Sequence, residues 1–395
     1  MTTYNQKHVK SIILNMRNFS LAVLLLLSVL FSSLGYGTDE YDGIDRIVAI
    51  GDLHGDYQQY LTLLRSNKLI DRKNKWQGGG THLVQLGDIV DRGPDSLKII
   101  RHLMKLEKQA KRAGGQVHVL IGNHEAMNIQ GVLDYVHTGE YSALVDKKSK
   151  RLREKYINAV FNYRVKVEPE LLEDEDALRA ELDALYPLGY VEHRQLWEPG
   201  QEVARWVAGH DTVLQLDDTI FLHGGLNPHT ELLPLNKINE GVRTELSQRF
   251  SGDGLANSPD GPIWYRGLAR NEAEQELEPL IAMLDHYGAS RIVIAHTPTR
   301  GAIVTRFEGR VVMIDVGLSA HYGGSMANLL IENGVPVAVH RGQPVPLPES
   351  EKELDAYFES VVALEPEGSK LVKYVAARKL PHAKAEIRVL ESGMP

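Results

Sequence analysis

The chain has 395 residues, 43% of them hydrophobic and 24% charged, and its formal net charge is −8. This composition is typical of a globular protein with one large domain or two smaller ones, and the negative charge argues against a nucleic-acid partner. The sequence contains no cysteine, which excludes disulfides, thiolate nucleophiles and cysteine-based zinc sites.

Residues 1–37 predict a secretory signal peptide that precedes the fold. Basic residues up to Arg17 come before an apolar run at residues 19–31, and small residues follow up to Gly37. This order is typical of a signal peptide, and the run is shorter than the roughly 20 residues that span a bilayer. We expect a periplasmic or secreted protein, because export without cysteine fits a bacterial periplasm. The alternative is an uncleaved segment, residues 19–34, that anchors the chain to a membrane.

The chain then alternates between strand and helix patterns. Three buried strands and two intervening amphipathic helices are predicted at residues 46–50, 57–67, 81–86, 95–113 and 116–121. Asp95 or Ser96 would cap the second helix. Strands that alternate with helices predict βαβ crossovers and a parallel arrangement.

Residues 135–200 break this alternation and predict a helical insertion. The segment is rich in charge, and residues 168–185 are strongly acidic. Two interpretations remain open. The insertion could cover the functional site as a cap, or it could form a solvated helical face, which is the commoner outcome for such charge patterns.

Strand patterns return after the insertion and are dense enough to predict a second sheet. They lie at residues 212–216, 219–225, 291–297, 302–307, 311–317 and 328–334, with a helix at 278–288. We therefore assign residues 38–345 to one domain. Residues 346–395 form a charged C-terminal extension for which the sequence predicts no role.

Polar clusters follow the first three predicted strands at the point where each strand ends. The motifs are "GDLHGD" from Gly51, "GDIVDRG" from Gly87 and "GNHE" from Gly122. Two later strands end at His223 and His296. In open α/β sheets, ligands bind at the carboxyl ends of the strands, so we expect these side chains to share one site.

The pooled side chains form a coherent set of metal ligands. They are Asp52, His54, Asp88, Asn123, His223 and His296. Oxygen and imidazole donors without sulfur suit manganese, iron or zinc, and six donors exceed the four of a structural zinc site. We predict two divalent ions, with Asp52 and His54 on one, Asn123 and the two late histidines on the other, and Asp88 bridging both. A single histidine at a strand end is more often structural, and we retain that interpretation for His82 and His118, which lie inside strands.

The motifs resemble the signature set of the phosphoprotein phosphatase family, within the calcineurin-like metallophosphoesterases. The resemblance rests on "GDLHG", "GDIVDRG", "GNHE", "HGG" and a later strand-terminal histidine, and it covers about residues 46–340. The predicted signal peptide and "GPIWYRG" resemble the Shewanella-like phosphatase branch. The resemblance implies an α/β fold with a β-sandwich of two mixed sheets flanked by helices. It also implies a two-metal centre built from the six ligands above.

The resemblance further implies roles for residues beside the ligands. His124 would be the general acid, and Asp91 would accept its hydrogen bond and orient it. Arg92 would bind the substrate phosphate together with Asn123 and Arg266. The surroundings of Arg266 are less typical of the family, and the alternative for it is a surface arginine. The family's "SAPNY" segment is replaced here by "SAHYGG" from Ser319, so substrate and inhibitor contacts there are not predicted.

We therefore expect a metal-dependent phosphomonoesterase that acts on phosphoproteins. A metal-bound hydroxide would attack phosphorus directly while His124 protonates the leaving oxygen, without a phosphoenzyme. One alternative is a small-molecule phosphatase or dinucleoside polyphosphate hydrolase with the same ligands. Another is an inactive phosphate-binding scaffold, against which His124, Asp91 and the complete ligand set argue. The sequence does not predict the preferred phosphoresidue, the native metals, the target or the oligomeric state.

Overall fold

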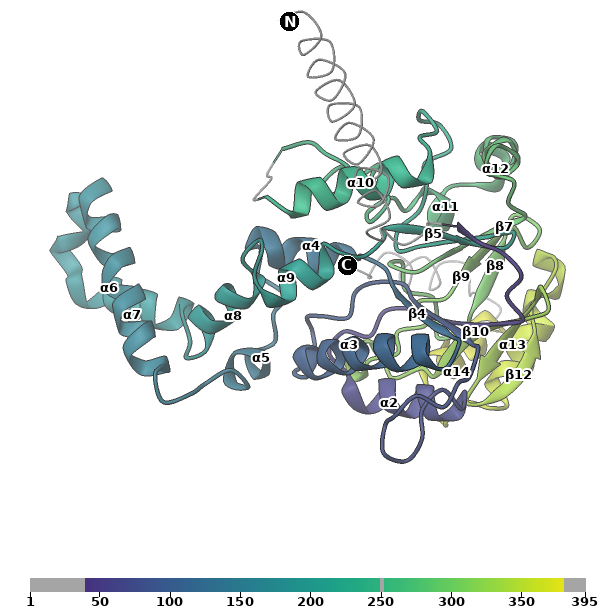
Figure 1. Cartoon of the computed structure of the whole chain (residues 1–395), viewed down its shortest axis with the longest axis horizontal. Coiled ribbons are helices and arrows are strands. Elements are labelled where there is room, and N and C mark those ends of the chain that lie inside the picture. Colours follow the sequence, from purple (N-terminus) through teal and green to yellow (C-terminus); the bar gives the residue numbers. More distant parts are fainter. Residues whose placement is uncertain (1–39, 249–251, 380–395) are drawn as a thin grey trace, which may run out of the picture. The chain divides into compact units, whose positions relative to one another are not determined.

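The structure, a computed structural model, describes residues 40–248 and 252–379 and contains two six-stranded sheets (Figure 1). The predicted signal peptide lies outside the described residues. One compact unit begins at Glu40. Within the two described ranges, no helix is long and apolar enough to cross a membrane.

The first sheet contains the three strands that the sequence predicted to be parallel neighbours. In spatial order its strands are β12 (Gln343–Pro346), β11 (Val335–His340), β10 (Ala327–Glu332), β2 (Arg46–Ile50), β3 (His82–Gln85) and β4 (Gln116–Val119). The strands β2, β3 and β4 are parallel, as predicted. The sequence placed β10 in the second sheet, and this was wrong, because β10 pairs antiparallel with β2. An apolar run indicates a strand but not its partner.

The second sheet contains the remaining predicted strands and one short strand that the sequence did not predict. In spatial order its strands are β1 (Glu40–Tyr41), β5 (Val213–Leu216), β6 (Thr219–Leu222), β7 (Arg291–Ile294), β9 (Val311–Met313) and β8 (Val304–Arg306). The strands β6, β7 and β9 are parallel. The strand β5 runs antiparallel to β6 and parallel to β1, and β8 runs antiparallel to β9. Both sheets are therefore mixed, which confirms the predicted fold class.

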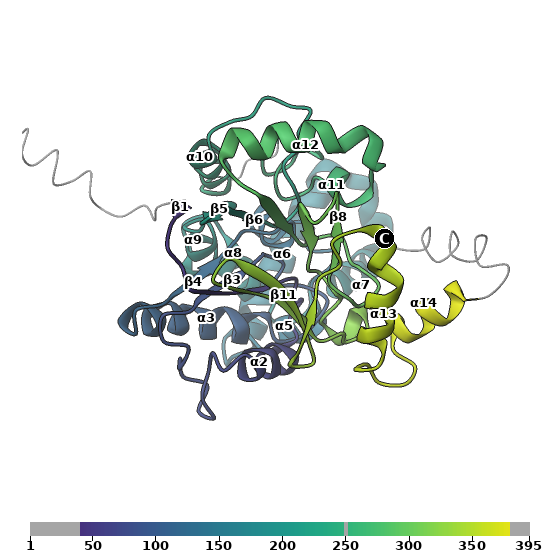
Figure 2. The same cartoon turned by 90° about the vertical axis from the view of Figure 1, so that its right-hand side faces the viewer.

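Alternating side chains of each strand build separate hydrophobic layers. On β2, Ile47 and Ala49 face the core between the sheets, where Phe221 of β6 is fully buried. Val48 and Ile50 point the other way, into a layer covered by helices. The helices on this face are α2 (Tyr57–Ser66) and α3 (Ser96–Arg112), and those on the outer face of the second sheet are α10 (Leu235–Leu246), α11 (Gly267–Arg270) and α12 (Ala273–Tyr287). Figures 1 and 2 show the two helical layers on opposite sides of the sheets.

The insertion forms a helical arm with a small core of its own. Its helices are α5 (Thr138–Ser142), α6 (Ser149–Val167), η1 (Pro169–Asp174), α7 (Glu175–Leu185) and α8 (Tyr190–Trp197), and α9 (Glu202–Val207) leads back to the sheets. Ile157 and Phe161 of α6 pack against Leu178 and Leu182 of α7. Most other side chains of these two helices are in contact with solvent, as expected for a charged helical surface.

The C-terminal segment completes the fold. After η3 (Glu351–Glu353), the helices α13 (Leu354–Val362) and α14 (Lys370–Arg378) pack on the core between the sheets. Val361 of α13 and Leu371 of α14 are fully buried there. The helices lie beside the sheets in Figure 2. The described part of this segment is therefore packed against the two sheets.

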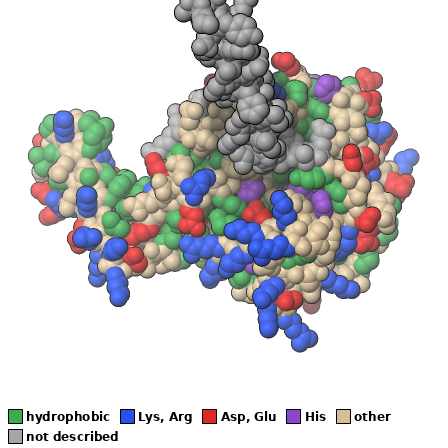
Figure 3. Space-filling model, in the orientation of Figure 1, with side chains coloured by type: hydrophobic (Ala, Val, Ile, Leu, Met, Phe, Trp, Pro, Cys, Tyr) green, Lys and Arg blue, Asp and Glu red, His purple; other side chains and the backbone are tan. Residues whose placement is uncertain are grey.

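The surface carries both signs of charge, although the formal net charge is −8. Figure 3 shows Lys and Arg side chains gathered on part of one face, while acidic side chains are scattered around the rest of that face. Charge is therefore distributed unevenly, and the net value does not describe every surface that a ligand meets.

Candidate active site and metal centre

The loops after the strands hold the predicted site residues in an unusual backbone conformation. Five of these residues have positive φ angles, namely His54, Asp88, Asp91, Arg92 and His296. Non-glycine residues rarely adopt this conformation, and it persists only where the surrounding structure enforces it. Gly93 shows how tightly the loops pack, because a Cβ on it would lie 2.4 Å from the carbonyl oxygen of His54.

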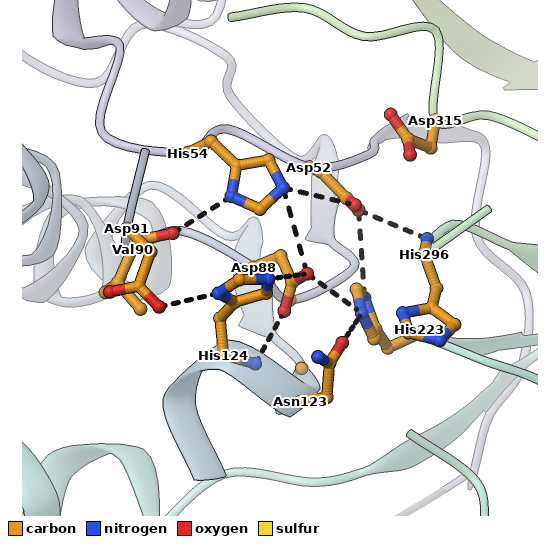
Figure 4. Close-up of polar contacts among 12 residues, drawn as sticks. Asp52, His54, Asp88, Val90, Asp91, Asn123, His124, His223, His296 and Asp315 are labelled. Carbon is orange, nitrogen blue, oxygen red and sulfur yellow. Dashed lines mark hydrogen bonds and ion pairs between the residues drawn. The ribbon is translucent and has the colours of Figure 1, made fainter. Parts of the chain in front are cut away.

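All six predicted ligands meet at one place, with Asp88 at the centre (Figure 4). Asp88 belongs to two groups of potential metal donors, one with His54 and His124, the other with His223 and His296. Its Oδ2 lies 3.3 Å from Nε2 of His223 and 3.9 Å from Nε2 of His54. This position is suited to a bridging carboxylate.

The two other predicted ligands lie beside these groups. Oδ2 of Asp52 is 3.7 Å from Nε2 of His54, and Oδ1 of Asp52 is 3.7 Å from Nδ1 of His223. Oδ1 of Asn123 is 2.9 Å from Nε2 of His223. The sequence pattern therefore identified a set of side chains that do converge in space.

The histidines are prepared to bind cations through Nε2. Nδ1 of His54 lies 3.0 Å from the carbonyl oxygen of Val90, and Nδ1 of His223 lies 2.7 Å from that of Leu86. A nitrogen that faces a carbonyl must carry the proton, which leaves Nε2 with its lone pair. Burial lowers the pKa of His54 to about 3, so its ring is neutral.

One further observation tests whether these residues fit metal ions. Nε2 of His296 is buried and has no hydrogen-bond partner. A buried polar atom without a partner is costly, and a cation at the donor group of Asp88, His223 and His296 would satisfy it. The residues present therefore fit the pair of divalent ions that the sequence predicts.

His124 and Asp91 form a hydrogen-bonded pair next to this centre. Nδ1 of His124 donates to Oδ2 of Asp91 at 2.6 Å, and Asn128 donates to the other oxygen of Asp91 at 2.9 Å. Burial opposes the charged form of His124, but the negative charge of Asp88 and the bond to Asp91 outweigh it and raise the pKa of His124. Asp88 and Asp91 therefore both stabilise the imidazolium form of the ring.

Glu125 holds the Asp88 loop in place. Its carboxylate accepts hydrogen bonds from the backbone N–H groups of Asp88, Ile89 and Gly122 at 2.8–2.9 Å. Burial, followed by the charge of Asp88, raises the pKa of Glu125 to about 7. The glutamate of the "GNHE" motif therefore positions the loop.

Asp315 is a site residue that sequence reasoning missed. It is buried beside Asp52 (Figure 4), and it accepts a hydrogen bond from the backbone N–H of Gly317 at 3.0 Å. Burial, and then the charges of Asp315 and Asp88, raise the pKa of Asp52 well above its usual range. Asp315 lies near the end of the strand predicted at residues 311–317, two positions before Gly317. A carboxylate close to a glycine at a strand end resembles the other clusters and could have identified this residue.

The two predicted phosphate-binding arginines line a cavity of about 560 Å³ that contains the centre. The guanidinium of Arg92 lies 4.2 Å from the ring centroid of Tyr135, and its Nε is buried without a hydrogen-bond partner. Arg266 donates to the carbonyl oxygen of His296 at 2.8 Å. The position of Arg266 at the cavity argues against the alternative of a surface arginine.

The residues for which a structural role was predicted lie elsewhere. Nε2 of His118 is 3.0 Å from Nδ1 of His82, and neither histidine lines the cavity. Asp95 precedes α3 but makes no side-chain capping bond, and it pairs instead with Lys98 at 2.6 Å. Within the described insertion, residues 135–200, only Tyr135 lines the cavity.

The far side of the cavity is built by segments to which the sequence assigned no role. Tyr322, in the 3₁₀ turn η2 (Ala320–Tyr322), lies with its ring centroid 5.0 Å from that of His54. Arg300 and three residues of α14, Lys370, Lys373 and Tyr374, line the cavity as well. Their contribution could not be predicted, because no sequence signal places a C-terminal helix beside loops from earlier in the chain.

Known proteins share this sequence pattern and fold. A model of the calcineurin-like phosphoesterase family matches residues 45–300. The chain is 32% identical to an uncharacterised protein of Schizosaccharomyces pombe, over 76% of this chain and 82% of that protein. It is 31% identical to Shewanella-like protein phosphatase 2 of Arabidopsis thaliana, over 70% of this chain and 72% of that protein. Among solved structures, the cold-active protein-tyrosine phosphatase of a psychrophilic Shewanella species matches with a TM-score of 0.59 and 28% identity, over 79% of this chain and 83% of that one.

Proposed function

Because the chain belongs to the calcineurin-like phosphoesterase family, and is a phosphatase of that family, we propose that it removes phosphate from phosphorylated proteins. The observation that carries this proposal is the place of Asp88 in two donor groups at once, together with the hydrogen bond from His124, a member of one of these groups, to Asp91. The first feature supports a two-ion centre, and the second supports proton transfer to a leaving group. The names of the similar protein phosphatases support a protein substrate.

The side chains of the site have distinct roles in this proposal. Two divalent ions, when bound, supply an activated water and positive charge for the phosphoryl oxygens. Arg92 and Arg266 bind the phosphate, because a guanidinium offers several donors in a geometry that matches its oxygens. His124 donates a proton to the leaving oxygen, and Asp91 fixes the orientation of the ring through Nδ1. Each of these side chains lines the cavity or contacts one that does.

The identity of the ions and the cellular location are part of the proposal. Carboxylate, amide and imidazole donors support manganese, iron or zinc. The basic and apolar sequence of residues 1–37 supports export to the periplasm or secretion.

The bridging role of Asp88 gives the decisive test. We expect Asp88→Asn to abolish phosphatase activity and to bring the metal content well below two per chain, since it removes the shared negative charge. Elemental analysis and an aryl phosphate assay measure both effects. Asp95→Asn, a loop residue outside the cavity, is the matched control and should retain metal and activity. A fully loaded and active Asp88→Asn protein would refute the bridging assignment.

A substrate panel tests the class of substrate. Phosphotyrosine, phosphoserine and phosphothreonine peptides should be hydrolysed with higher kcat/KM than mononucleotides and dinucleoside polyphosphates. A clear preference for the nucleotides would overturn the assignment to phosphoproteins and leave the metallophosphatase assignment intact.

A further inference from the structure

We propose that Arg300, Lys370 and Lys373, here called the basic rim, form a subsite for a second negatively charged group on the substrate. This group would be an acidic side chain or a second phosphate next to the phosphoester that is cleaved. The proposal rests on the proposed protein phosphatase function and adds a preference among phosphopeptides. All three residues line the cavity that contains the metal centre.

The position of the two lysines is fixed by the packing of α14. Leu371 and Val375 lie one helical turn apart and are buried in the core between the sheets. Lys370, Lys373 and Tyr374 lie on the part of the helix that faces the cavity, as expected for residues three and four positions apart. The fold therefore holds the helix that carries the two lysines of the basic rim in place.

The stem of Lys370 connects the rim to the metal centre. It runs along Gly323, where a Cβ would lie 3.0 Å from both Cδ and Cε of the lysine. Gly323 follows Tyr322, whose ring lies beside His54. Burial, and then the charges of Arg92 and Lys370, lower the pKa of His321. The ring of His321 is thus close both to Arg92, a predicted phosphate-binding arginine, and to Lys370 of the basic rim.

Ion pairing on α14 distinguishes the cavity side from the outer side. Arg378 pairs with Asp355 at 2.7 Å, and Lys379 pairs with Glu359 at 3.0 Å. Lys370 and Lys373 are exposed, and their ammonium groups have no ion pair or hydrogen bond with any described residue. On α14, Arg378 and Lys379 are thus neutralised by the protein itself, whereas Lys370 and Lys373, which line the cavity, are left for a ligand.

The cavity has more positive charge than one phosphate requires. Its basic residues are Arg92, Arg266, Arg300, Lys370 and Lys373. Two arginines and two divalent ions already match a single dianionic phosphate, and the ions also offset the acidic ligands. The net charge of the chain is −8, so this local excess is not a general property of the protein. A second anionic group explains it, because complementary charge attracts and orients a ligand.

The experiment compares matched phosphopeptides. One carries Asp or Glu beside the phosphoresidue, one carries Asn or Gln at the same positions, and one carries a second phosphoresidue. We expect the wild-type enzyme to bind one or both of the charged peptides with a KM about 3- to 10-fold lower than the neutral one, as a few exposed ion pairs allow. The ratio of KM for the neutral peptide to KM for the charged peptide should approach one in the Lys370→Ala/Lys373→Ala double variant. In the wild-type enzyme the same ratio should decrease with added salt. Lys379→Ala is the control from the outer side of α14 and should keep the wild-type ratio.

The outcomes identify the ligand of the basic rim, and they distinguish failure of the basic rim from failure of the proposed protein phosphatase function. Preference for the acidic peptide alone identifies a carboxylate ligand, and preference for the doubly phosphorylated peptide alone identifies a phosphate. Equal KM values for all three peptides in wild type, or a ratio that survives in the double variant, would overturn the basic rim while the protein phosphatase function stands. Hydrolysis of para-nitrophenyl phosphate without hydrolysis of any peptide would overturn both.

Discussion

The ring of His124 is in contact with other side chains on several sides, and these contacts determine which of its nitrogens can transfer a proton to a substrate. Nδ1 is bound to Asp91, the ring packs edge-on against His54 with centroids 4.9 Å apart, and Tyr135 lies on another side at 5.2 Å. Only Nε2 remains to act on a substrate. A proton held there matters most when the leaving oxygen is strongly basic.

The leaving group therefore distinguishes a general acid from a phosphate-binding residue. We expect His124→Asn to slow hydrolysis of phosphopeptides and alkyl phosphates by about 10²- to 10⁴-fold, and that of para-nitrophenyl phosphate far less, with both metals retained. Asp91→Asn should show the same pattern more mildly, because it disturbs the orientation of the acid. Steady-state rates and a metal count for each variant give the comparison. Equal slowing for good and poor leaving groups would remove the acid role.

Glu140, from the insertion, supports the pair of His124 and Asp91 through a hydrogen bond to the backbone of Asp91. Its Oε1 accepts hydrogen bonds from the backbone N–H of Asp91 at 3.2 Å and from Oγ of Ser96 at 2.5 Å. Burial raises the pKa of Glu140 to about 8, so the carboxyl group is mostly neutral at pH 7. Gln is a close isostere of that form, whereas Ala removes the acceptor for Asp91.

Two variants test whether the side chain of Glu140 positions Asp91 by accepting its hydrogen bond. We expect Glu140→Gln to keep activity near pH 7 and Glu140→Ala to lower kcat on phosphopeptides more than on para-nitrophenyl phosphate. The stability effect has a definite sign. A carboxyl group with a raised pKa in the folded state contributes stability below its unfolded pKa and loses it as pH rises toward 8, at up to about 1.4 kcal/mol per pH unit. Urea unfolding at pH 5 and pH 8 should show a larger loss for wild type than for Glu140→Gln, and an equal loss would contradict the raised pKa.

At the scale of elements, the helical arm does not cover the site. The acidic segment forms η1 and α7 and packs on α6 through a small separate core. Within the described insertion only Tyr135 reaches the cavity. The structure thus favours a solvated helical face over a cap.

Deletion of residues 168–185 should therefore leave the ranking of substrates unchanged. Ile157 and Phe161 would lose their partners, so both are replaced by Gln in the same variant to keep the remaining helix soluble. Relative kcat/KM values for a phosphopeptide series and an aryl phosphate provide the measurement. Tyr135→Ala is the positive control, because this ring contacts Arg92 and should alter the series. A changed ranking in the folded deletion variant would restore the cap hypothesis.

The sequence predicted those elements whose signals are local. A buried apolar run that ends in Gly-Asp places β2, β3 and their loops without knowledge of the rest of the chain. A third run at the same spacing ends in Gly-Asn, and the three runs together predict parallel neighbours. The sheet to which β10 belongs depends on pairing with β2, about 280 residues earlier, and periodicity carries no information on partners. The contribution of α14 escaped prediction for the same reason.

At the scale of the whole molecule, the metal centre concentrates buried charge. Asp52 and Asp315 are buried side by side, and burial together with neighbouring carboxylates raises the pKa of each. Without bound cations, the folded protein must keep these two carboxyl groups close together as they become negatively charged, and their repulsion lowers its stability. Such groups contribute stability at low pH and lose it as pH rises through their folded pKa values.

Removal of the metal should therefore destabilise the protein, and more so at higher pH. We expect chelation to lower Tm at pH 8 by more than at pH 6, and Mn²⁺ or Zn²⁺ to restore it in a concentration-dependent way, since a ligand of the native state stabilises by mass action. Differential scanning calorimetry with and without chelator gives the measurement. An identical Tm for the stripped and loaded protein at pH 8 would contradict this account of the site.

The pairing of β2 with β10 has a consequence for the order in which the protein is made. All six predicted ligands lie between Asp52 and His296, so they are all synthesised before Ala327–Glu332. Until β10 has been synthesised, one edge of β2 is unpaired, and the loop that begins with Asp52 follows a strand of an incomplete sheet. Nascent chains and products of premature termination near residue 300 would thus carry every ligand and still be without activity.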